Sequence, residues 1–130
     1  MGITRLYGIR NFFLAGAAVA TLAACGTMGD TGAVKDAYQQ AIACETDKAL
    51  ASVDRAARGG GLGAELADLQ GVVILRDAGR TSEAAAALAE RNARVNADAE
   101  AAAEAEKGVA ESLAELRAER QESTGRRTCR

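Results

Sequence analysis

The chain has 130 residues, with 18 acids against 16 bases, and it lacks Pro, Trp and His. This charge balance offers no basic face for phosphates, so nucleic acid is not an expected partner, and the absence of His removes the commonest catalytic base and metal ligand. Alanine is the commonest residue and the best helix former, whereas Pro is the worst, so the composition predicts an all-α fold.

The first 24 residues have the pattern of an export signal. Arg5 and Arg10 lie in a segment without acids, and an apolar run follows at 12–24, FFLAGAAVATLAA. A basic start and an apolar core of about 7–15 residues are typical of a cleaved signal, whereas a membrane-spanning helix needs about 20 apolar residues. Residues 1–24 therefore predict a signal peptide.

The apolar run ends in Leu22-Ala23-Ala24-Cys25, which resembles the lipobox of bacterial lipoproteins. The resemblance implies that 1–24 is a lipoprotein signal peptide, with cleavage between Ala24 and Cys25, and lipid on the thiol and the new amine of Cys25. An ordinary signal or a short anchor, followed by a chance cysteine, is the alternative. Several acyl chains anchor a protein stably, whereas one holds it only marginally. Residue 26 is Gly rather than Asp, so by the same resemblance we expect the outer membrane, facing the periplasm, with the inner membrane or cell surface as alternatives.

Cleavage would leave a mature chain of 106 residues with 18 acids and 14 bases, a net charge of −4. This length is enough for one small domain. We expect a flexible, lipidated tether over 25–32, a helical domain over 33–123 and a basic C-terminal tail over 124–130. The arginines of the tail either contact an anionic envelope polymer or lie in a solvated chain end.

The predicted domain is a small antiparallel helical hairpin or bundle, with about three to four helices and a long C-terminal one. Residues 33–58 form one long helix or two short ones, and the glycines after Arg58 end this part. A helix over 63–78 follows, with a strand over 71–76 as the alternative. Its apolar side chains are expected in the core: Leu66, Leu69, Val73 and Leu75.

The region from Ser82 to Glu122 favours helix almost throughout, with Lys107-Gly108 as the one expected break. Apolar residues recur in it every seven positions: Leu88, Val95, Ala102, Val109 and Leu116. This seam predicts either a free-standing coiled coil or one face of a long helix packed on the earlier helices.

Two cysteines remain once Cys25 carries lipid. The compartment is oxidising, so Cys44 and Cys129 are candidates for a disulfide. Closing a loop of that length stabilises a fold by roughly 4 kcal/mol in the chain-entropy model. An intermolecular bond and two free thiols are the alternatives.

The segment around Gly79-Arg80, with Ala84 four residues later, resembles the turn of a tetratricopeptide repeat. In that family a Gly-Arg or Gly-Lys turn precedes an Ala that packs between paired helices. A weaker echo surrounds Ala49, 35 residues before Ala84. The resemblance covers 33–92, and generic antiparallel helices with Ala at their crossings are the alternative.

The acids are spaced along helices and form no dyad or triad, so we expect no catalytic residues, no metal site, no cofactor and no enzyme activity. The sequence favours a lipid-anchored scaffold or adaptor that binds another envelope protein or a second copy of itself. Its short heptad seam is also similar to that of the Braun-type murein lipoprotein, which makes a structural stalk the alternative. A small lipid-handling or ligand-handling lipoprotein is the third class.

Overall fold

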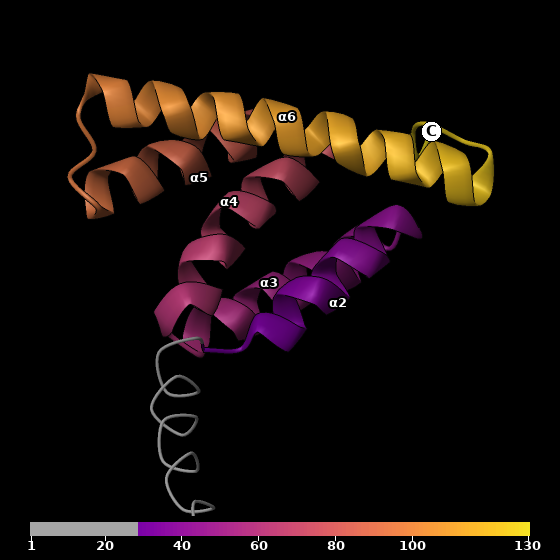
Figure 1. Cartoon of the computed structure of the whole chain (residues 1–130), viewed down its shortest axis with the longest axis horizontal. Helices are drawn as coiled ribbons and strands as arrows, with labels where there is room; N and C mark the ends of the chain where they lie inside the picture. The colour runs from indigo at the N-terminus through magenta and orange to yellow at the C-terminus, as the bar shows by residue number, and fades with distance from the viewer. Residues whose placement is uncertain (1–28) are drawn as a thin grey trace, which may run out of the picture.

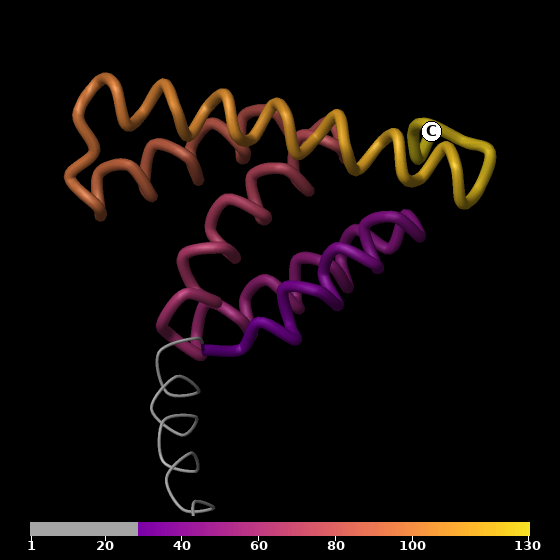
Figure 2. The backbone as a smooth tube through the Cα atoms, viewed as in Figure 1, coloured from indigo at the N-terminus to yellow at the C-terminus, as the bar shows by residue number. Residues whose placement is uncertain are grey.

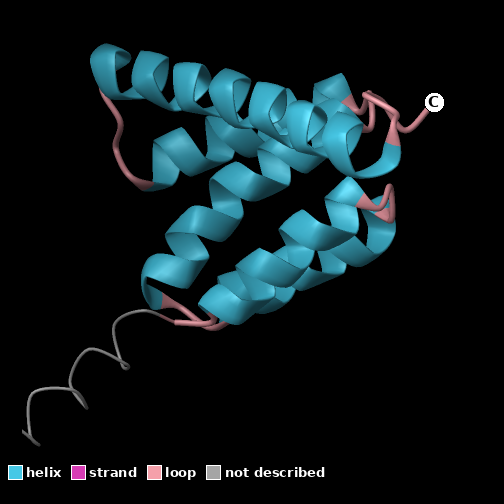
Figure 3. Cartoon of the chain, turned by 45° about the vertical axis from the view of Figure 1, so that its right-hand side comes forward, coloured by secondary structure: helices cyan, strands magenta, loops and turns pink. Residues whose placement is uncertain are grey.

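The computed structural model describes residues 29–130, in which every regular element is a helix (Figure 1, Figure 3). The predicted signal peptide, the cleavage site at Ala24 and the lipidation site at Cys25 lie outside the described residues. The elements are α2 (Thr31–Ile42), α3 (Thr46–Arg58), α4 (Gly61–Asp77), α5 (Thr81–Arg94) and α6 (Ala99–Thr124). The predicted all-α class and long C-terminal helix are confirmed, and the described residues hold five helices rather than three to four. None of these helices is both long and apolar enough to cross a membrane.

Two helical hairpins follow one another with a spacing of 35 residues. The pairs α2–α3 and α4–α5 have matching ends, because α2 ends at Ile42 and α4 at Asp77, while α3 begins at Thr46 and α5 at Thr81. The turns between them also match, hydrogen bond for hydrogen bond. In the first turn residues 43, 44 and 45 donate backbone N–H groups to the carbonyls of 39, 41 and 40, and in the second turn residues 78, 79 and 80 donate to 74, 76 and 75.

Cys44 and Gly79 occupy equivalent left-handed positions in these two turns. Gly79 has φ of 76° and Cys44 has φ of 62°. Glycine adopts this conformation readily, whereas a residue with a Cβ pays roughly 1 kcal/mol. In the sequence, the turn is therefore easy to recognise at Gly79 and hard to recognise at Cys44, because a cysteine occupies the position that glycine has in the second turn.

Helix α4 is the centre of the domain. It contacts all four other helices, with α2 and α3 on one side and α5 and α6 on the other (Figure 2). Its apolar run Val72–Leu75 is buried on every side, which explains the run of four apolar residues and shows that the alternative of a strand there is wrong. Ala49 and Ala84 are fully buried at the hairpin crossings, where a larger side chain would hold the helices apart.

Of the two alternatives for 33–58, the structure has the two helices, since Cys44 and its neighbours turn the chain. One predicted boundary needs correction. Helix α2 begins at Thr31 rather than 33, because the Asp30 side chain accepts a hydrogen bond from the Ala33 backbone N–H at 2.9 Å and caps it. The last two residues of the predicted tether thus belong to the domain.

The expected break at Lys107-Gly108 is wrong, and α6 runs through it. The chain turns instead at 95–98, between α5 and α6, where Asn96 is left-handed and Asp98 caps α6 by accepting from the Ala101 N–H at 2.8 Å. The heptad seam is therefore not one helix face. Val95 is 48 % exposed in the turn, while Val109 and Leu116 are buried inside the domain, so the region 82–122 divides at 95–98 rather than at Lys107-Gly108.

Gly108 is a glycine that the helix does not need. A Cβ added there would meet no atom within 4 Å. Glycine in a helix interior is less favourable than Ala by about 0.5–1 kcal/mol, so Gly108→Ala is expected to raise the free energy of unfolding by that amount. Urea unfolding followed by circular dichroism measures the change, and a decrease in stability would contradict the open space seen in front of Gly108.

Candidate functional site

An open groove of about 280 Å³ lies between α2, α4 and α6, which form three sides of a triangle in Figure 1. Its lining is mainly apolar, with a few polar groups: Tyr38, Leu66, Leu69, Gln70, Val73, Gly108, Val109, Ser112 and Glu115. Apolar lining with few polar groups is typical of binding sites. A smaller groove of about 210 Å³ lies between α3, α4 and α5, where Arg94 and Asp68 form an ion pair.

The groove changes the role of one residue that was expected in the core. Val73 and Leu75 are buried, at 4 % and 9 % exposure, and Leu69 is half-buried. Leu66, however, is 43 % exposed, so the prediction of a core position is wrong for it. Leu66 lies one helical turn before Leu69 and Gln70, in the first half of α4. Its side chain lines the groove with theirs and is not part of the core.

The α6 side of the groove is negatively charged near Tyr38. The Tyr38 hydroxyl donates a hydrogen bond to Glu119 Oε2 at 2.7 Å, and Glu115 lines the groove. Burial, the bond to Glu119 and the negative charges of Glu119 and Glu115 raise the pKa of Tyr38 from about 10 to about 12, against an opposing effect of Arg120. A partner bearing Lys or Arg would therefore meet a favourable field there.

Titration of Tyr38 tests this arrangement. It is the sole tyrosine of the predicted mature chain, since the other is Tyr7. The unfolded state loses the phenol proton near pH 10 and the folded state near pH 12, so stability falls as the pH rises through this window. Tyrosinate absorbance should rise with a midpoint well above pH 10, and Glu119→Gln should lower that midpoint. A midpoint at the ordinary value of tyrosine would contradict the Tyr38–Glu119 contact.

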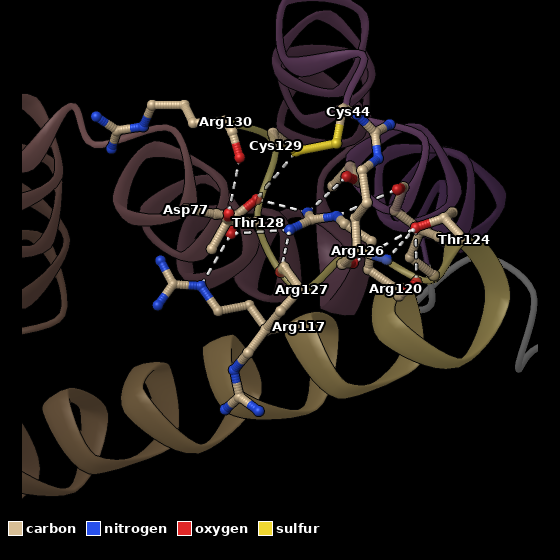
Figure 4. A network of polar contacts seen from close by, with 12 residues as sticks. Cys44, Asp77, Arg117, Arg120, Thr124, Arg126, Arg127, Thr128, Cys129 and Arg130 are labelled. Carbon is tan, nitrogen blue, oxygen red and sulfur yellow. Dashed lines mark hydrogen bonds and ion pairs between the residues drawn. A yellow bond between two sulfur atoms is a disulfide. The ribbon is translucent and has the colours of Figure 1, made fainter.

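The second polar centre is a buried cluster around Arg120, which is 0 % exposed (Figure 4). Its guanidinium donates to Asp77 Oδ2 at 2.5 Å, to Ala41 O at 2.7 Å and to Ile42 O at 3.2 Å. The last carbonyls of a helix lack partners within the helix and carry partial negative charge. Arg120 thus binds the ends of α2 and α4, which are equivalent positions in the two hairpins, and holds both to α6.

The remaining contacts of the cluster complete its hydrogen bonding. Arg117 donates to Asp77 Oδ1 at 3.1 Å, and Arg120 donates to the Arg127 carbonyl at 3.1 Å. Among the described residues no buried side-chain nitrogen or oxygen lacks a hydrogen-bond partner. Such a cluster positions the three walls of the groove, because Arg120 of α6 binds the ends of α2 and α4.

The C-terminal tail is bound to the same cluster. The structure joins Cys129 to Cys44 by a disulfide, which was one of three alternatives, and Cys129 lies beside Asp77 (Figure 4). After α6 ends at Thr124, this bond joins the end of the chain to the turn between α2 and α3. The tail at 124–130 is thus fixed at its end, although the side chains of Arg126, Arg127 and Arg130 remain exposed.

The predicted repeat-like residues come together at the second turn. Gly79 ends α4 in a left-handed conformation, and Arg80 pairs with Glu83 in the first turn of α5 at 2.5 Å. Ala84 is fully buried against α4. The hydrogen bond between Arg80 and Glu83 lowers the pKa of the Glu83 carboxyl. These residues shape the hairpin and do not line the groove.

The Arg120 cluster was missed from the sequence because a charged residue usually lies in solvent. One pattern points to it, however. Val109, Leu113 and Leu116 follow helical spacing on the inner face of α6, and Arg120 is the next position of that stripe.

No group of three or more Cys, Asp or Glu side chains suited to a metal ion occurs among residues 29–130. Comparison of the chain with protein-family models, curated proteins and solved structures finds no significant match. Its likeness to lipoproteins and to tetratricopeptide repeats therefore depends on the residues described above.

Proposed function

We propose that this protein is an adaptor, held by lipid on Cys25 at the periplasmic face of the outer membrane, that binds an apolar segment of another envelope protein. The anchor is inferred from Leu22-Ala23-Ala24-Cys25 after the apolar run. The adaptor role depends on one observation, the groove between α2, α4 and α6.

The position of this groove in the repeat supports binding. Stacked helical hairpins use the concave face between equivalent helices to bind partners. Helices α2 and α4 are the first helices of the two hairpins, and they contribute Tyr38 and Leu69 to the groove. Helix α6 adds the third wall with Glu115. An amphipathic helix with one basic residue opposite Glu115 fits this combination of apolar floor and acidic wall.

The stalk alternative is less well supported. Val109 and Leu116, the two best residues of its seam, are 1 % exposed because they pack inside the domain, so the seam is not free to pair in a coiled coil. The ligand-handling alternative needs an enclosed apolar cavity, whereas the groove is open to solvent and carries Glu115 and Gln70.

The test is crosslinking in the native host, followed by solubilisation in detergent and mass spectrometry of the captured proteins. Gly108→Trp fills the groove from α6, and Gly108→Ala is its matched control because a Cβ there meets no atom within 4 Å. The wild-type chain and Gly108→Ala should capture one defined partner. Gly108→Trp should reduce the yield about tenfold, the effect of roughly 1.4 kcal/mol of lost binding.

A second control, Cys25→Ser, should also lose the partner, because the unanchored chain leaves the membrane surface. Equal capture by Gly108→Trp and Gly108→Ala would contradict binding in the groove. Recovery of self-crosslinks alone would favour the structural alternative.

A further inference from the structure

Exposed leucines gather at the end of the domain where the chain enters it. The large apolar residues most exposed in the described part are Leu62 at 45 %, Leu66 at 43 % and Val95 at 48 %. Leu62 and Leu66 are one helical turn apart on α4, so their side chains are neighbours. Val95 lies in the turn between α5 and α6, which is set apart from the loop at the start of α4 (Figure 1).

The start of α4 is also where the chain leaves toward Cys25. Gly29 is in direct contact with Gly60, and the position of a Cβ on Gly59 is 3.2 Å from the Asp30 backbone. Gly29 is four steps along the chain from Cys25, and an extended chain spans at most about 3.5 Å per step, or about 14 Å here. Lipid on Cys25 would therefore hold the first turn of α4 close to the membrane surface, because Gly29 beside it is at most about 14 Å from the anchored residue.

The charges at this end suit a shallow contact with lipid. The loop Gly59–Gly61 is uncharged, and Arg58 before it is exposed and makes no ion pair within the described residues. A cation near an anionic bilayer surface is attracted to the headgroups. Glu65 is exposed between the two leucines in the sequence, and a carboxylate is costly in hydrocarbon. This limits the contact to the interfacial layer.

We infer that the first turn of α4 lies on the lipid surface, with Leu62 and Leu66 entering the interface beside the anchor. This inference rests on the proposed lipidation of Cys25. It gives the domain a fixed orientation, in which α6 lies on the side of the domain away from the membrane (Figure 1). The groove then opens beside the bilayer rather than against it, since only its Leu66 end touches lipid.

The chain contains no Trp, so a single introduced Trp reports its own surroundings. Leu62→Trp and the matched control Val95→Trp would be made in the full chain, isolated in lipidated form from the host. Each would be placed in vesicles of phosphatidylethanolamine and phosphatidylglycerol, some carrying bromine near the headgroup end of the acyl chains. Circular dichroism checks that both variants keep the helical fold, as expected for exposed positions.

The expected result is a blue-shifted emission for Leu62→Trp and quenching by bromine of about twofold or more, because the side chain lies at the headgroup boundary. Val95→Trp should emit as in water and be unaffected. Flotation with the vesicles but equal quenching, or none, at both positions would overturn the inference and leave the anchor intact. Failure of the chain to float would overturn the anchor, and with it this inference.

Discussion

Replacing Arg120 with Met is expected to lower the free energy of unfolding by about 3–5 kcal/mol, because it leaves the Asp77 carboxylate buried without its main partner. The Asp77 side chain is 6 % exposed, and the carbonyls of Ala41 and Ile42 lose their donor as well. Urea unfolding of the mature chain, made without lipid as Cys25→Ser and with its disulfide intact, measures the loss.

Arg117 provides the matched control, because it binds the same carboxylate from a half-buried position. Its side chain is 31 % exposed, and an ion pair near the surface contributes about 0–1 kcal/mol. Arg117→Met should therefore cost far less than Arg120→Met. Adding Asp77→Leu to Arg120→Met should recover part of the loss, since it removes the unpaired charge. Similar small losses for both arginine variants would contradict the clamp between the hairpins.

Removing the disulfide is expected to have an effect of similar size. Cys44 and Cys129 are 85 residues apart, and opening a loop of that length costs about 4 kcal/mol in the chain-entropy model. Cys129→Ser, or reduction of the mature chain, should lower the urea midpoint accordingly. Two further variants, Cys44→Gly and Cys44→Ala, are compared in the Cys129→Ser background, where no disulfide can form.

Cys44→Gly should restore about 1 kcal/mol relative to Cys44→Ala, because residue 44 has positive φ and glycine takes this conformation without strain. This outcome would show that Cys44 stands where the repeat otherwise has Gly79. A Cys44→Gly variant less stable than Cys44→Ala would contradict the equivalence of the two turns.

The helical class and two of the turns follow from local chemistry. Alanine favours helix, and Gly59 and Gly79 follow the ends of α3 and α4, where helix ends were expected. The turn at 95–98 was missed although Asn96 and Asp98 are residues that tolerate left-handed backbone and cap helices. The alanines on either side favour helix continuously, so the turn signals of Asn96 and Asp98 did not stand out in the sequence. At Gly108 a break was expected, but α6 continues through it. Burial of Val109 and Leu116 offsets the cost of about 1 kcal/mol of a glycine inside a helix.

The groove and the clamp depend on contacts between distant parts of the chain, so local patterns could not place them. Asp77 and Arg120 are 43 residues apart and share no motif. Leu62, Leu66, Leu69 and Val73 form one apolar stripe on α4, and the stripe alone does not say which of them the other helices cover. Tertiary packing leaves Leu62 and Leu66 exposed, Leu69 half-buried and Val73 buried.

The measurement that tests the central claim most directly is the intact mass of the protein isolated from the envelope of its host, with Cys25→Ser as the control. The account predicts a chain that starts at Cys25, carries acyl groups on that residue and holds Cys44 and Cys129 as a disulfide. Cys25→Ser should lack the acyl mass. A full-length chain of 130 residues, or a cleaved chain without acyl groups, would contradict the lipid anchor on which the proposed adaptor role depends.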